Sequence, residues 1–389
     1  MITEEVKKEL KSHIAPFWMQ LMDNEYGGFY GYVGYGLEVD KKADKGVILH
    51  SRILWFFSKC YSVLKDENCR RFAFHAFEYI KNRCIDYDYG GVFWMTSYKG
   101  FPTDMMKHTY NIAFAVYALS CYYNAFGDRF ALDLAYKLFN DIEENTVDEY
   151  GYREAFTIDW ELVPNEALSE NGLMADKTMN TVLHLIEAYT ELYKADKNER
   201  VAERLRYLLS IVRDKIYDPE RKALKVFFDT KMDVIGDIHS YGHDIEASWL
   251  IDLACDTLGD EELRKEWAER DLLISGNILD IAFENGALNN ERDKTEINRT
   301  RIWWVQAEAV VGFTNAYQHS GDERFAEAAR SVWEYIKSDM IDKRWNGEWF
   351  SEVSFEGVPD ESKEIVGPWK CPYHNGRMCL EIISRNAGI

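Results

Sequence analysis

Two histidines, a carboxylate and an indole stand close together in the segment 236–249. If a helix begins at Tyr241, His243 and Glu246 are three residues apart and share one of its faces. Imidazole titrates near neutral pH, so His243 can take up or release a proton, and a nearby carboxylate can fix its tautomer. Polar residues that only cap a buried helix would have the same types, so this segment alone does not decide the function.

Side chains of the same kind recur at the starts of other predicted helices. They are His50 and Arg52; His108, Tyr110 and Asn111; Asn180 and His184; His239, His243 and Glu246; Arg301, Trp303, Trp304 and Glu308; and Trp369, His374 and Arg377. Helix N-termini carry partial positive charge, which suits a developing oxyanion. If these helices form one ring, their first turns meet at one mouth and predict a single site. A hydrogen-bonded polar rim without catalysis is the alternative.

The residue types favour proton transfer over the other chemistries considered. His239 and His243 are four residues apart and, with Glu246, could bind zinc, but the H-E-x-x-H pattern is absent. Walker, G-x-G-x-x-G and G-x-S-x-G motifs are also absent. Glu246 and Glu308 could serve a glycoside hydrolase, but the histidines would then be surplus. We therefore expect neither a metal nor a cofactor, and proton transfer at the carbon next to a sugar carbonyl.

Helical periodicity dominates the elements that must position these residues. It predicts helices at 2–22, 46–64, 68–83, 108–126, 128–143, 174–195, 198–214, 241–257, 260–281, 301–320, 323–339 and 371–385. Short links such as Gly127-Asp128 and Gly259-Asp260 combine a C-terminal glycine with an N-capping aspartate. They predict tight helical hairpins.

The long links between helices contain short aromatic or β-branched runs after a turn signal. These runs lie at 27–33, 90–95, 151–156, 223–228, 286–290 and 347–352, and each predicts a small β-hairpin. They recur every sixty to seventy residues, which is typical of a repeat architecture. The pattern predicts an all-α (α/α)6 barrel that spans residues 1–389 as a single catalytic domain, with an open solenoid as the alternative.

Composition excludes several classes of partner. The chain has 389 residues and a formal charge of −21, which argues against nucleic acid and anionic membranes. No apolar run is long enough to span a membrane, and the charged N-terminus is unlike a signal peptide. The seven cysteines form no C-x-x-C pair and fit reduced thiols, so a cytoplasmic protein is expected. Aromatic residues make up 15%, which suits stacking against a sugar.

These residues resemble those of the N-acylglucosamine 2-epimerase family over nearly the whole chain. The matching segments are His-Ser-Arg-Ile-Leu-Trp (50–55), Lys-His-Thr-Tyr-Asn-Ile-Ala-Phe (107–114), Met-Asn (179–180) with His184, Ser-Tyr-Gly-His-Asp-Ile-Glu (240–246), Trp-Trp-Val-Gln-Ala-Glu (303–308) and Gly-Pro-Trp-Lys-Cys-Pro-Tyr-His-Asn (367–375). The resemblance is to the branch that acts on β-1,4-linked disaccharides such as cellobiose and lactose. It implies an (α/α)6 barrel, no cofactor, and interconversion of the reducing-end glucose with mannose.

The resemblance also implies roles for single residues. His243 and His374 would be the two bases, Arg52 would stabilise the negative charge on O1 or O2, and Glu246 would hold His243. The residues expected to bind substrate are Tyr110, Asn111, Asn180, His184, Trp303, Trp304, Glu308 and Trp369. N-acylglucosamine 2-epimerase or mannose isomerase activity within the same family, and an (α/α)6-barrel hydrolase, are the alternatives. We expect a small-molecule substrate and a monomer or weak homodimer.

Overall fold

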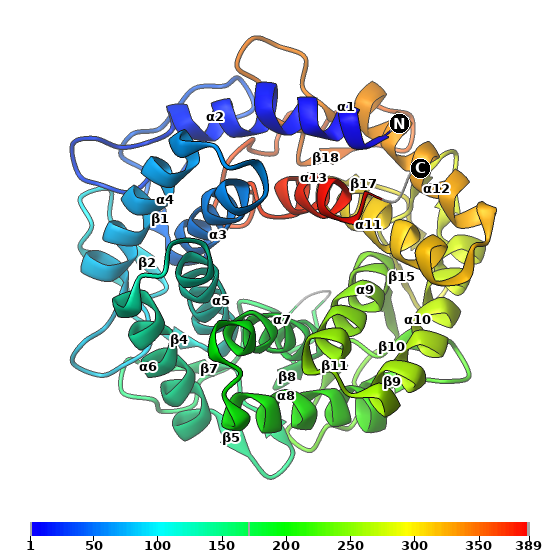
Figure 1. The fold of residues 1–389 in the computed structure, drawn as a ribbon, viewed down its shortest axis with the longest axis horizontal. Coiled ribbons are helices and arrows are strands. Elements are labelled where there is room, and N and C mark those ends of the chain that lie inside the picture. Colours follow the sequence, from blue (N-terminus) through cyan, green and yellow to red (C-terminus); the bar gives the residue numbers. More distant parts are fainter. Residues whose placement is uncertain (1, 170–171, 387–389) are drawn as a thin grey trace.

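The protein is a barrel of helices in two concentric rings, as a computed structural model describes it for residues 2–169 and 172–386 (Figure 1). The inner ring consists of α3 (Val47–Leu64), α5 (Thr109–Phe126), α7 (Met179–Asp196), α9 (Tyr241–Leu258), α11 (Trp303–Ser320) and α13 (His374–Arg385). Each inner helix contacts the next, and α13 contacts α3. The predicted (α/α)6 barrel is thereby confirmed.

The outer ring is formed by the helices that alternate with these in the sequence. They are α1 (Ile2–Glu9), α2 (Ala15–Gln20), α4 (Glu67–Tyr79), α6 (Arg129–Asn145), α8 (Glu199–Ile211), α10 (Glu261–Ile281) and α12 (Glu323–Tyr335). π-Helical turns at Leu10–Ile14, Ile80–Cys84, Val212–Ile216 and Ile336–Met340 join α1 to α2 and extend α4, α8 and α12. Helix α1 packs against α13, so the two ends of the chain lie close together (Figure 1).

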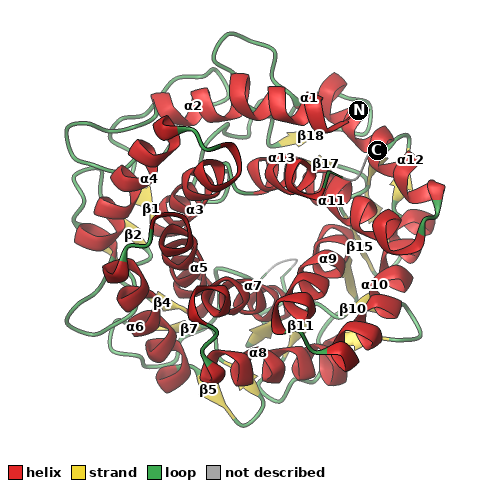
Figure 2. Ribbon diagram, in the orientation of Figure 1, coloured by secondary structure: helices red, strands yellow, loops and turns green. Residues whose placement is uncertain are grey.

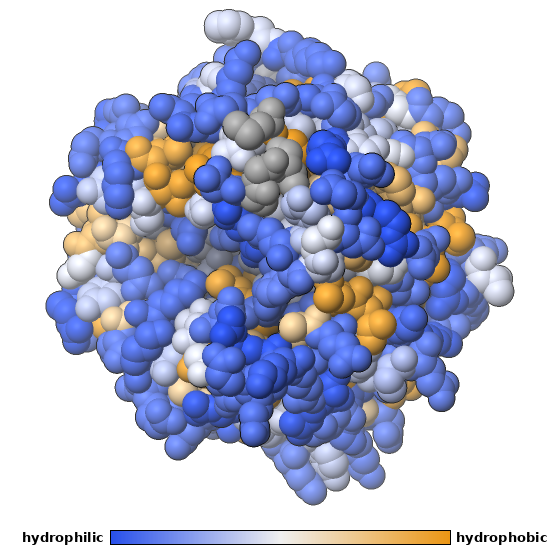
Figure 3. Space-filling view, turned by 45° about the vertical axis from the view of Figure 1, so that its right-hand side comes forward, coloured by the Kyte–Doolittle hydropathy of each residue, from blue (hydrophilic) through white to orange (hydrophobic). Residues whose placement is uncertain are grey.

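The two rings differ in their sequence patterns because they differ in burial. Inner helix α5 is apolar around nearly its whole circumference and is buried from Thr109 to Tyr122. Outer helix α12 is amphipathic and buries Phe325, Ala329 and Val332 against the inner ring. The face drawn in Figure 3 is mostly hydrophilic, with hydrophobic residues in separate groups. No helix of the described residues is both long enough and apolar enough to pass through a membrane.

Tight turns connect each inner helix to the outer helix that follows it. At the end of α5, Gly127 adopts a φ of 72°, and Asp128 then accepts hydrogen bonds from the backbone N–H groups of Phe130 and Ala131. The same pairing of a left-handed residue with a capping side chain follows α3, α7, α9 and α11. The prediction from the Gly-Asp links is confirmed.

Short antiparallel strands occupy the long links at the opposite end of the helices (Figure 2). They pair as β1 (Lys45–Gly46) with β2 (Met95–Thr96) and β3 (Pro102–Asp104); β4 (Lys107–His108) with β7 (Ala155–Phe156); β5 (Val147–Asp148) with β6 (Gly151–Tyr152); β8 (Lys177–Thr178) with β11 (Phe227–Phe228); β9 (Tyr217–Asp218) with β10 (Ala223–Leu224); β12 (Ile238–Ser240) with β15 (Glu291–Asp293) and β16 (Glu296–Asn298); β13 (Phe283–Glu284) with β14 (Ala287–Leu288); and β17 (Arg301–Ile302) with β18 (Glu352–Val353). Single bridges Met22–Phe29, Ile85–Val92 and Ile341–Trp349 complete the six predicted hairpins.

Some predicted helices begin too early. The predicted starts at residues 174, 301 and 371 are wrong, because the observed helices begin at Met179, Trp303 and His374. Residues 177–178 and 301–302 are extended strands that pair with the link of the following repeat. Val33 pairs in the same way with Val366 and joins the first repeat to the last. Long-range strand pairing therefore overrides local helical propensity at residues 177–178 and 301–302, whereas residues 371–373 form a bend before α13.

Buried ion pairs hold the starts of three inner helices. Lys107 precedes α5, and its Nζ lies 2.6 Å from Oδ2 of Asp86, which follows the π-helical end of α4. Equivalent pairs join Lys45 to Asp23 at 2.7 Å and Lys177 to Asp148 at 2.5 Å. Each pair clamps the two ends of one long link, so the first turn of the inner helix that follows has a fixed position.

Loss of the cation in one such pair should be costly. Replacing Lys107 by Met leaves the Asp86 carboxylate buried without its partner, and we expect the free energy of unfolding in urea to fall by about 3–5 kcal/mol. Arg70→Met is the control, because the Arg70–Glu67 pair spans 3.8 Å with side chains 59% and 71% exposed. Its loss should cost at most about 1 kcal/mol. Equal urea midpoints for Lys107→Met and wild type would contradict the clamp.

Candidate active site

The first turns of the inner helices surround a cavity of about 270 Å³. Its wall is formed by Arg52, Tyr110, Ala167, Leu168, Asn180, His184, His243, Glu246, Trp303, Trp304, Trp369 and His374. Nine of these side chains come from the six inner helices, and the other three come from links. The predicted convergence of helix starts on one site is confirmed.

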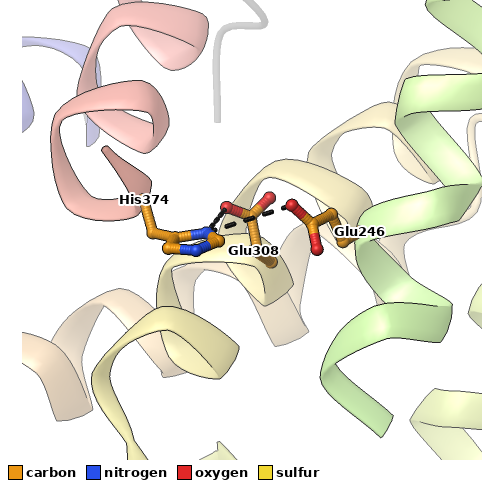
Figure 4. Close-up of side chains that lie close together, drawn as sticks. All are labelled: Glu246, Glu308 and His374. Carbon is orange, nitrogen blue, oxygen red and sulfur yellow. Dashed lines mark hydrogen bonds and ion pairs between the residues drawn. The ribbon is translucent and has the colours of Figure 1, made fainter. Parts of the chain in front are cut away.

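His374 is the first residue of α13 and sits on two carboxylates from other helices. Its Nδ1 lies 2.8 Å from Oε1 of Glu308 on α11 and 3.9 Å from Oε1 of Glu246 on α9 (Figure 4). Burial lowers the pKa of His374 well below its usual value, and the positive charges of Arg377 and Arg52 act in the same direction. The imidazole is therefore neutral near neutral pH and keeps the nitrogen remote from Glu308 free for proton transfer.

The carboxyl group of Glu308, beside His374, has a raised pKa. Burial raises the pKa of Glu308 to about 8, although Arg377 opposes that rise. Arg377 Nη2 donates to Oε1 of Glu308 at 2.7 Å, and Trp249 Nε1 donates to Oε2 at 3.0 Å. Near neutral pH one proton therefore belongs to the Glu308–His374 pair, and the pair can supply or absorb it.

Arg377 links all the carboxylates beneath the cavity. Its guanidinium is fully buried, with Nη2 bonded to Glu246 Oε1 and Glu308 Oε1. Its Nη1 donates to Glu187 Oε1 at 2.5 Å and also contacts the Tyr373 hydroxyl. One cation thus holds three carboxylates that come from α7, α9 and α11.

Glu187 supports a third histidine of the cavity, His184. Burial acts to raise its pKa, but the charge of Arg377 and hydrogen bonds from His184 and Tyr373 lower the pKa of Glu187 to about 2. The ionised carboxylate accepts from Tyr373 Oη at 2.5 Å and lies 3.0 Å from Nδ1 of His184. A carboxylate can only accept, so Nδ1 of His184 carries a hydrogen. The second ring nitrogen of His184 is thereby left to face the cavity.

His243 on α9 has a different support. Its Nδ1 lies 2.7 Å from the Ser240 hydroxyl, and burial lowers the pKa of His243 to about 4 against the opposing charge of Glu246. The Trp304 ring lies 4.8 Å from the His243 ring and 5.4 Å from the His374 ring, measured between centroids. The two imidazoles predicted as bases therefore reach the same indole from two different helices.

Arg52 presents a positive charge without a carboxylate partner among residues 2–169 and 172–386. Its Nη2 donates to the Tyr110 hydroxyl at 2.8 Å, and its Nη1 donates to the carbonyl of Trp369 at 3.3 Å. The guanidinium lies 4.2 Å from the centroid of the Phe114 ring. Its charge is thus held in place by a neutral hydroxyl, a carbonyl and an aromatic face, and remains available to an anionic oxygen.

Indoles from two segments form the aromatic part of the wall. Trp303 and Trp304 begin α11, while Trp369 lies in the link before α13 and is 36% exposed. Trp94 packs edge-on against Trp369, with 6.0 Å between the ring centroids. Trp369 is therefore fixed at the open side of the cavity, where a flat apolar face can stack on a sugar.

Three of the predicted site residues lie outside the cavity wall or bind partners other than the expected ones. Asn111 does not reach the cavity, because it is fully buried and its Nδ2 donates to the carbonyl of Phe93 at 2.9 Å. Glu308 lies beneath His374 and is fully buried, so it supports that base and does not line the cavity wall. Glu246 is bonded to Arg377, while His243 is held by Ser240.

Three other histidines that begin repeats have structural roles. His50 Nε2 accepts from the backbone N–H of Phe29, and its Nδ1 bonds to the carbonyl of Gly46. His108 accepts from the N–H of Tyr110 and caps α5. His239 bonds to Asp244 at 2.7 Å, outside the cavity wall. Of the three, His108 shows the capping role that was the alternative for a single histidine, while His50 and His239 bind backbone and carboxylate groups.

Several residues of the site were not predicted from the sequence. Glu187 could have been found from its position three residues after His184, which places both on one face of α7. Tyr373 lies four residues before Arg377, and Ser240 lies three before His243, so both are close to their partners in the sequence. Ala167 and Leu168 complete the wall from a long link, and no pattern in the sequence points to them.

Glu246, Glu308 and His374 offer ligand atoms within 4.8 Å of one another, which is a spacing that a metal could use. The Oε1 atoms of both glutamates already accept from Arg377 Nη2. The guanidinium therefore supplies the positive charge that a metal would bring to these oxygens, and the donor set fits an arginine-bridged cluster better than a metal centre.

Sequence comparison relates the chain to known epimerases. The family model for N-acylglucosamine 2-epimerase matches residues 27–375. A cellobiose 2-epimerase from Ruminococcus albus is 68% identical over 389 residues, which is the full length of both chains. A cellobiose 2-epimerase from Dictyoglomus turgidum is 44% identical over 99% of each chain.

Solved structures agree with these relatives. A sugar epimerase from a ruminal bacterium superposes with a TM-score of 0.98 at 68% identity and 99% coverage of both chains. A cellobiose 2-epimerase from Bacillus thermoamylovorans gives a TM-score of 0.96 at 45% identity, again over 99% of both chains. A GH76 α-mannanase from Bacteroides thetaiotaomicron gives a TM-score of 0.67 at 11% identity and shares the fold alone, over 99% of this chain and 97% of its own.

The depressed pKa of His243 can be measured directly. We expect its ring nitrogens to titrate with a midpoint near pH 4 in ¹⁵N NMR, because burial disfavours the imidazolium. His319 is the matched control, since its hydrogen bond to Asp252 raises its pKa above the usual value. It should therefore titrate above about pH 6.5. A midpoint for His243 as high as that of His319 would contradict the neutral imidazole.

Proposed function

The chain belongs to the N-acylglucosamine 2-epimerase family, and from this membership we propose that it has cellobiose 2-epimerase activity. It would interconvert glucose and mannose at the reducing end of β-1,4-linked disaccharides, converting cellobiose to 4-O-β-D-glucosyl-D-mannose and lactose to epilactose. The observation that carries the proposal is the placement of His243 and His374. Two neutral imidazoles from separate helices meet over one indole, next to an arginine that has no carboxylate partner.

Inversion at C2 dictates what the site must do. The C2 proton is acidic only beside a carbonyl, so the sugar ring must first open to the aldehyde. One base then removes the C2 proton, and the electron pair moves into an enediolate whose negative charge lies on oxygen. A proton returns to C2 on the opposite face, which requires either a second base or a rotation of the intermediate.

His243 and His374 supply the two proton-transfer groups in this proposal. At neutral pH one group must start without a proton and the other must have one to give. His243 is neutral there because its pKa is about 4, while the Glu308–His374 pair holds a shared proton. After one turnover the protons have changed places, and the same arrangement serves the reverse reaction.

Arg52 is suited to the charge that develops between these two steps. Its guanidinium can donate two parallel hydrogen bonds to O1 and O2 of the enediolate. Tyr110, Asn180 and His184 line the same cavity and offer hydrogen bonds to the sugar hydroxyls. Trp303, Trp304 and Trp369 offer faces on which the two sugar rings can stack.

The geometry argues against the hydrolase alternative. A glycosidase needs two carboxyl groups on either side of the scissile bond. Oε1 of Glu246 and Oε1 of Glu308 both accept hydrogen bonds from one arginine, and ligand atoms of Glu246, Glu308 and His374 lie within 4.8 Å of one another. The arginine lies between these carboxylates, so no glycosidic bond can be placed between them.

Several broader features belong to the same proposal. We propose that residues 1–389 act as one catalytic domain that needs no metal or cofactor. We also propose a cytoplasmic location, which agrees with the scattered cysteines, and a monomer or weak homodimer, which agrees with the mostly hydrophilic face drawn in Figure 3.

Incubation with cellobiose in heavy water tests the reaction class. In the presence of a chelator, we expect NMR to show a disaccharide with mannose at its reducing end and deuterium at C2. Release of glucose would indicate a hydrolase, and binding without a product would indicate a sugar-binding protein. Complete loss of activity on chelation, restored by one metal, would contradict the cofactor-free mechanism.

Single replacements of the two histidines test the assignment of the bases. His243→Asn and His374→Asn should each lower the rate of epimerisation by at least about a hundredfold, because each removes one acid–base group. One of them should still exchange the C2 proton of the starting sugar with heavy water, since exchange on one face needs only one imidazole. His319→Asn, outside the cavity, is the control. Retention of more than about a tenth of the wild-type rate in either variant would favour a single base.

A further inference from the structure

Ser240 occupies a capping position but caps nothing. It is the N-cap residue of α9, and serine is among the preferred residues there because its hydroxyl accepts a hydrogen bond from the second or third backbone N–H of the helix. Asp66, Asp128, Thr178, Asn198, Asp260 and Asp322 all make such a bond in the helices that they begin. The Ser240 side chain makes no capping bond and lies 2.7 Å from Nδ1 of His243.

We propose that Ser240 is a positioning residue that accepts a hydrogen bond from Nδ1–H of His243 and so fixes the tautomer in which Nε2 transfers the proton. The imidazole N–H then takes the place of the backbone N–H in an ordinary cap. This inference rests on the proposed function, because it assigns a purpose to Ser240 in the chemistry of His243.

The protonation states that His243 passes through in the proposed reaction require this tautomer. When His243 acts as a base, Nε2 must be unprotonated, so the single ring hydrogen must be on Nδ1. When His243 returns a proton, the ring is an imidazolium and Nδ1 again carries a hydrogen. Nδ1–H is therefore present in both states, and a hydroxyl oxygen that accepts from it serves both directions of a reversible reaction. If Ser240 donated to Nδ1 instead, Nε2 would carry the hydrogen and could not take the C2 proton.

The backbone around Ser240 keeps the hydroxyl in position. Ser240 is the last residue of β12 and pairs with Glu291 of β15, and the N–H of Tyr241 bonds to the carbonyl of Asn290. Ser240 itself is only 7% exposed. The strand therefore holds Oγ beside the third residue of the helix, where the His243 ring is also packed against Trp304.

A hydroxyl differs from the carboxylates that support the other two histidines of the cavity. Nδ1 of His184 faces Glu187, and Nδ1 of His374 faces Glu308. A carboxylate would stabilise the imidazolium and make His243 a stronger base, whereas a neutral hydroxyl fixes the tautomer without adding charge. Ser240 thus orients the ring and leaves its proton affinity low.

Three replacements of Ser240 separate positioning from folding. Ser240→Ala removes the acceptor, and we expect kcat for cellobiose to fall by about tenfold or more with little change in KM, because general acid–base groups contribute about a hundred- to ten-thousandfold. Ser240→Thr keeps the hydroxyl and should restore most of kcat. Ser240→Asp supplies a charged acceptor and should move the acid limb of the kcat/KM profile to higher pH.

Two further measurements do not depend on turnover. In ¹⁵N NMR, wild-type His243 should show the Nδ1–H tautomer, and Ser240→Ala should show a mixture of tautomers. The thermal midpoint of Ser240→Ala should stay close to that of wild type, whereas Asp322→Ala should lower it, because Asp322 caps α12 through the N–H of Arg324.

The outcomes distinguish this proposal from the proposed function. An Nε2–H tautomer in wild type, or wild-type kcat and an unchanged tautomer in Ser240→Ala, would overturn the role of Ser240 whatever the substrate is. If cellobiose is not epimerised but the NMR results are as expected, Ser240 still positions His243 and the reaction class is wrong. A lower thermal midpoint together with equal losses in kcat/KM for Ala and Thr would show a structural role only.

Discussion

The buried guanidinium of Arg377 is the interaction on which the site depends. Glu187, Glu246 and Glu308 enter the interior from three helices, and without a cation their charges would repel one another in a region of low dielectric. Arg377 bonds to all three, and two of them in turn hold His184 and His374. A single buried charge therefore fixes the tautomer of one histidine and the proton shared by another. Burial raises the pKa of Glu308 to about 8 although Arg377 opposes that rise, which explains why Glu308 retains a proton near neutral pH.

The barrel makes this cluster possible because it brings one end of every inner helix to the same place. Short capped turns close the helix pairs at the opposite end, and the long links all lie at the end that carries the site. Buried ion pairs such as Lys107–Asp86 then fix the position of the first turns in the barrel. The two histidines proposed as bases, His243 and His374, lie in these first turns, and of the cavity wall only Trp369, Ala167 and Leu168 come from links. A rigid frame of helices thus carries the proton-transfer groups, and the links complete the substrate wall.

Much of this organisation could be predicted from the sequence, because it depends on local rules. Apolar periodicity located the helices, the Gly-Asp links located the turns, and the concentration of histidines, indoles and arginines located the mouth of the barrel. The observed contacts differ from the expected ones where partners are far apart in the chain. Asn111 has a side chain that could bind a sugar, but its amide donates a hydrogen bond to the carbonyl of Phe93 in a link. Glu246 is on the same helical face as His243, but Arg377, 131 residues further along the chain, binds it more directly.

The three cavity histidines illustrate how one residue type acquires different chemistry from its support. His184 rests on an ionised carboxylate, His374 on a carboxyl group that shares a proton, and His243 on a neutral hydroxyl. A reversible reaction at carbon needs groups that exchange roles, and three equally strong bases would all be protonated or all be unprotonated at a given pH. Unequal supports allow a neutral and a proton-bearing group to coexist at one pH. The proposed chemistry therefore requires this asymmetry. It comes from the groups that contact Nδ1 of each histidine, which motif matching does not detect.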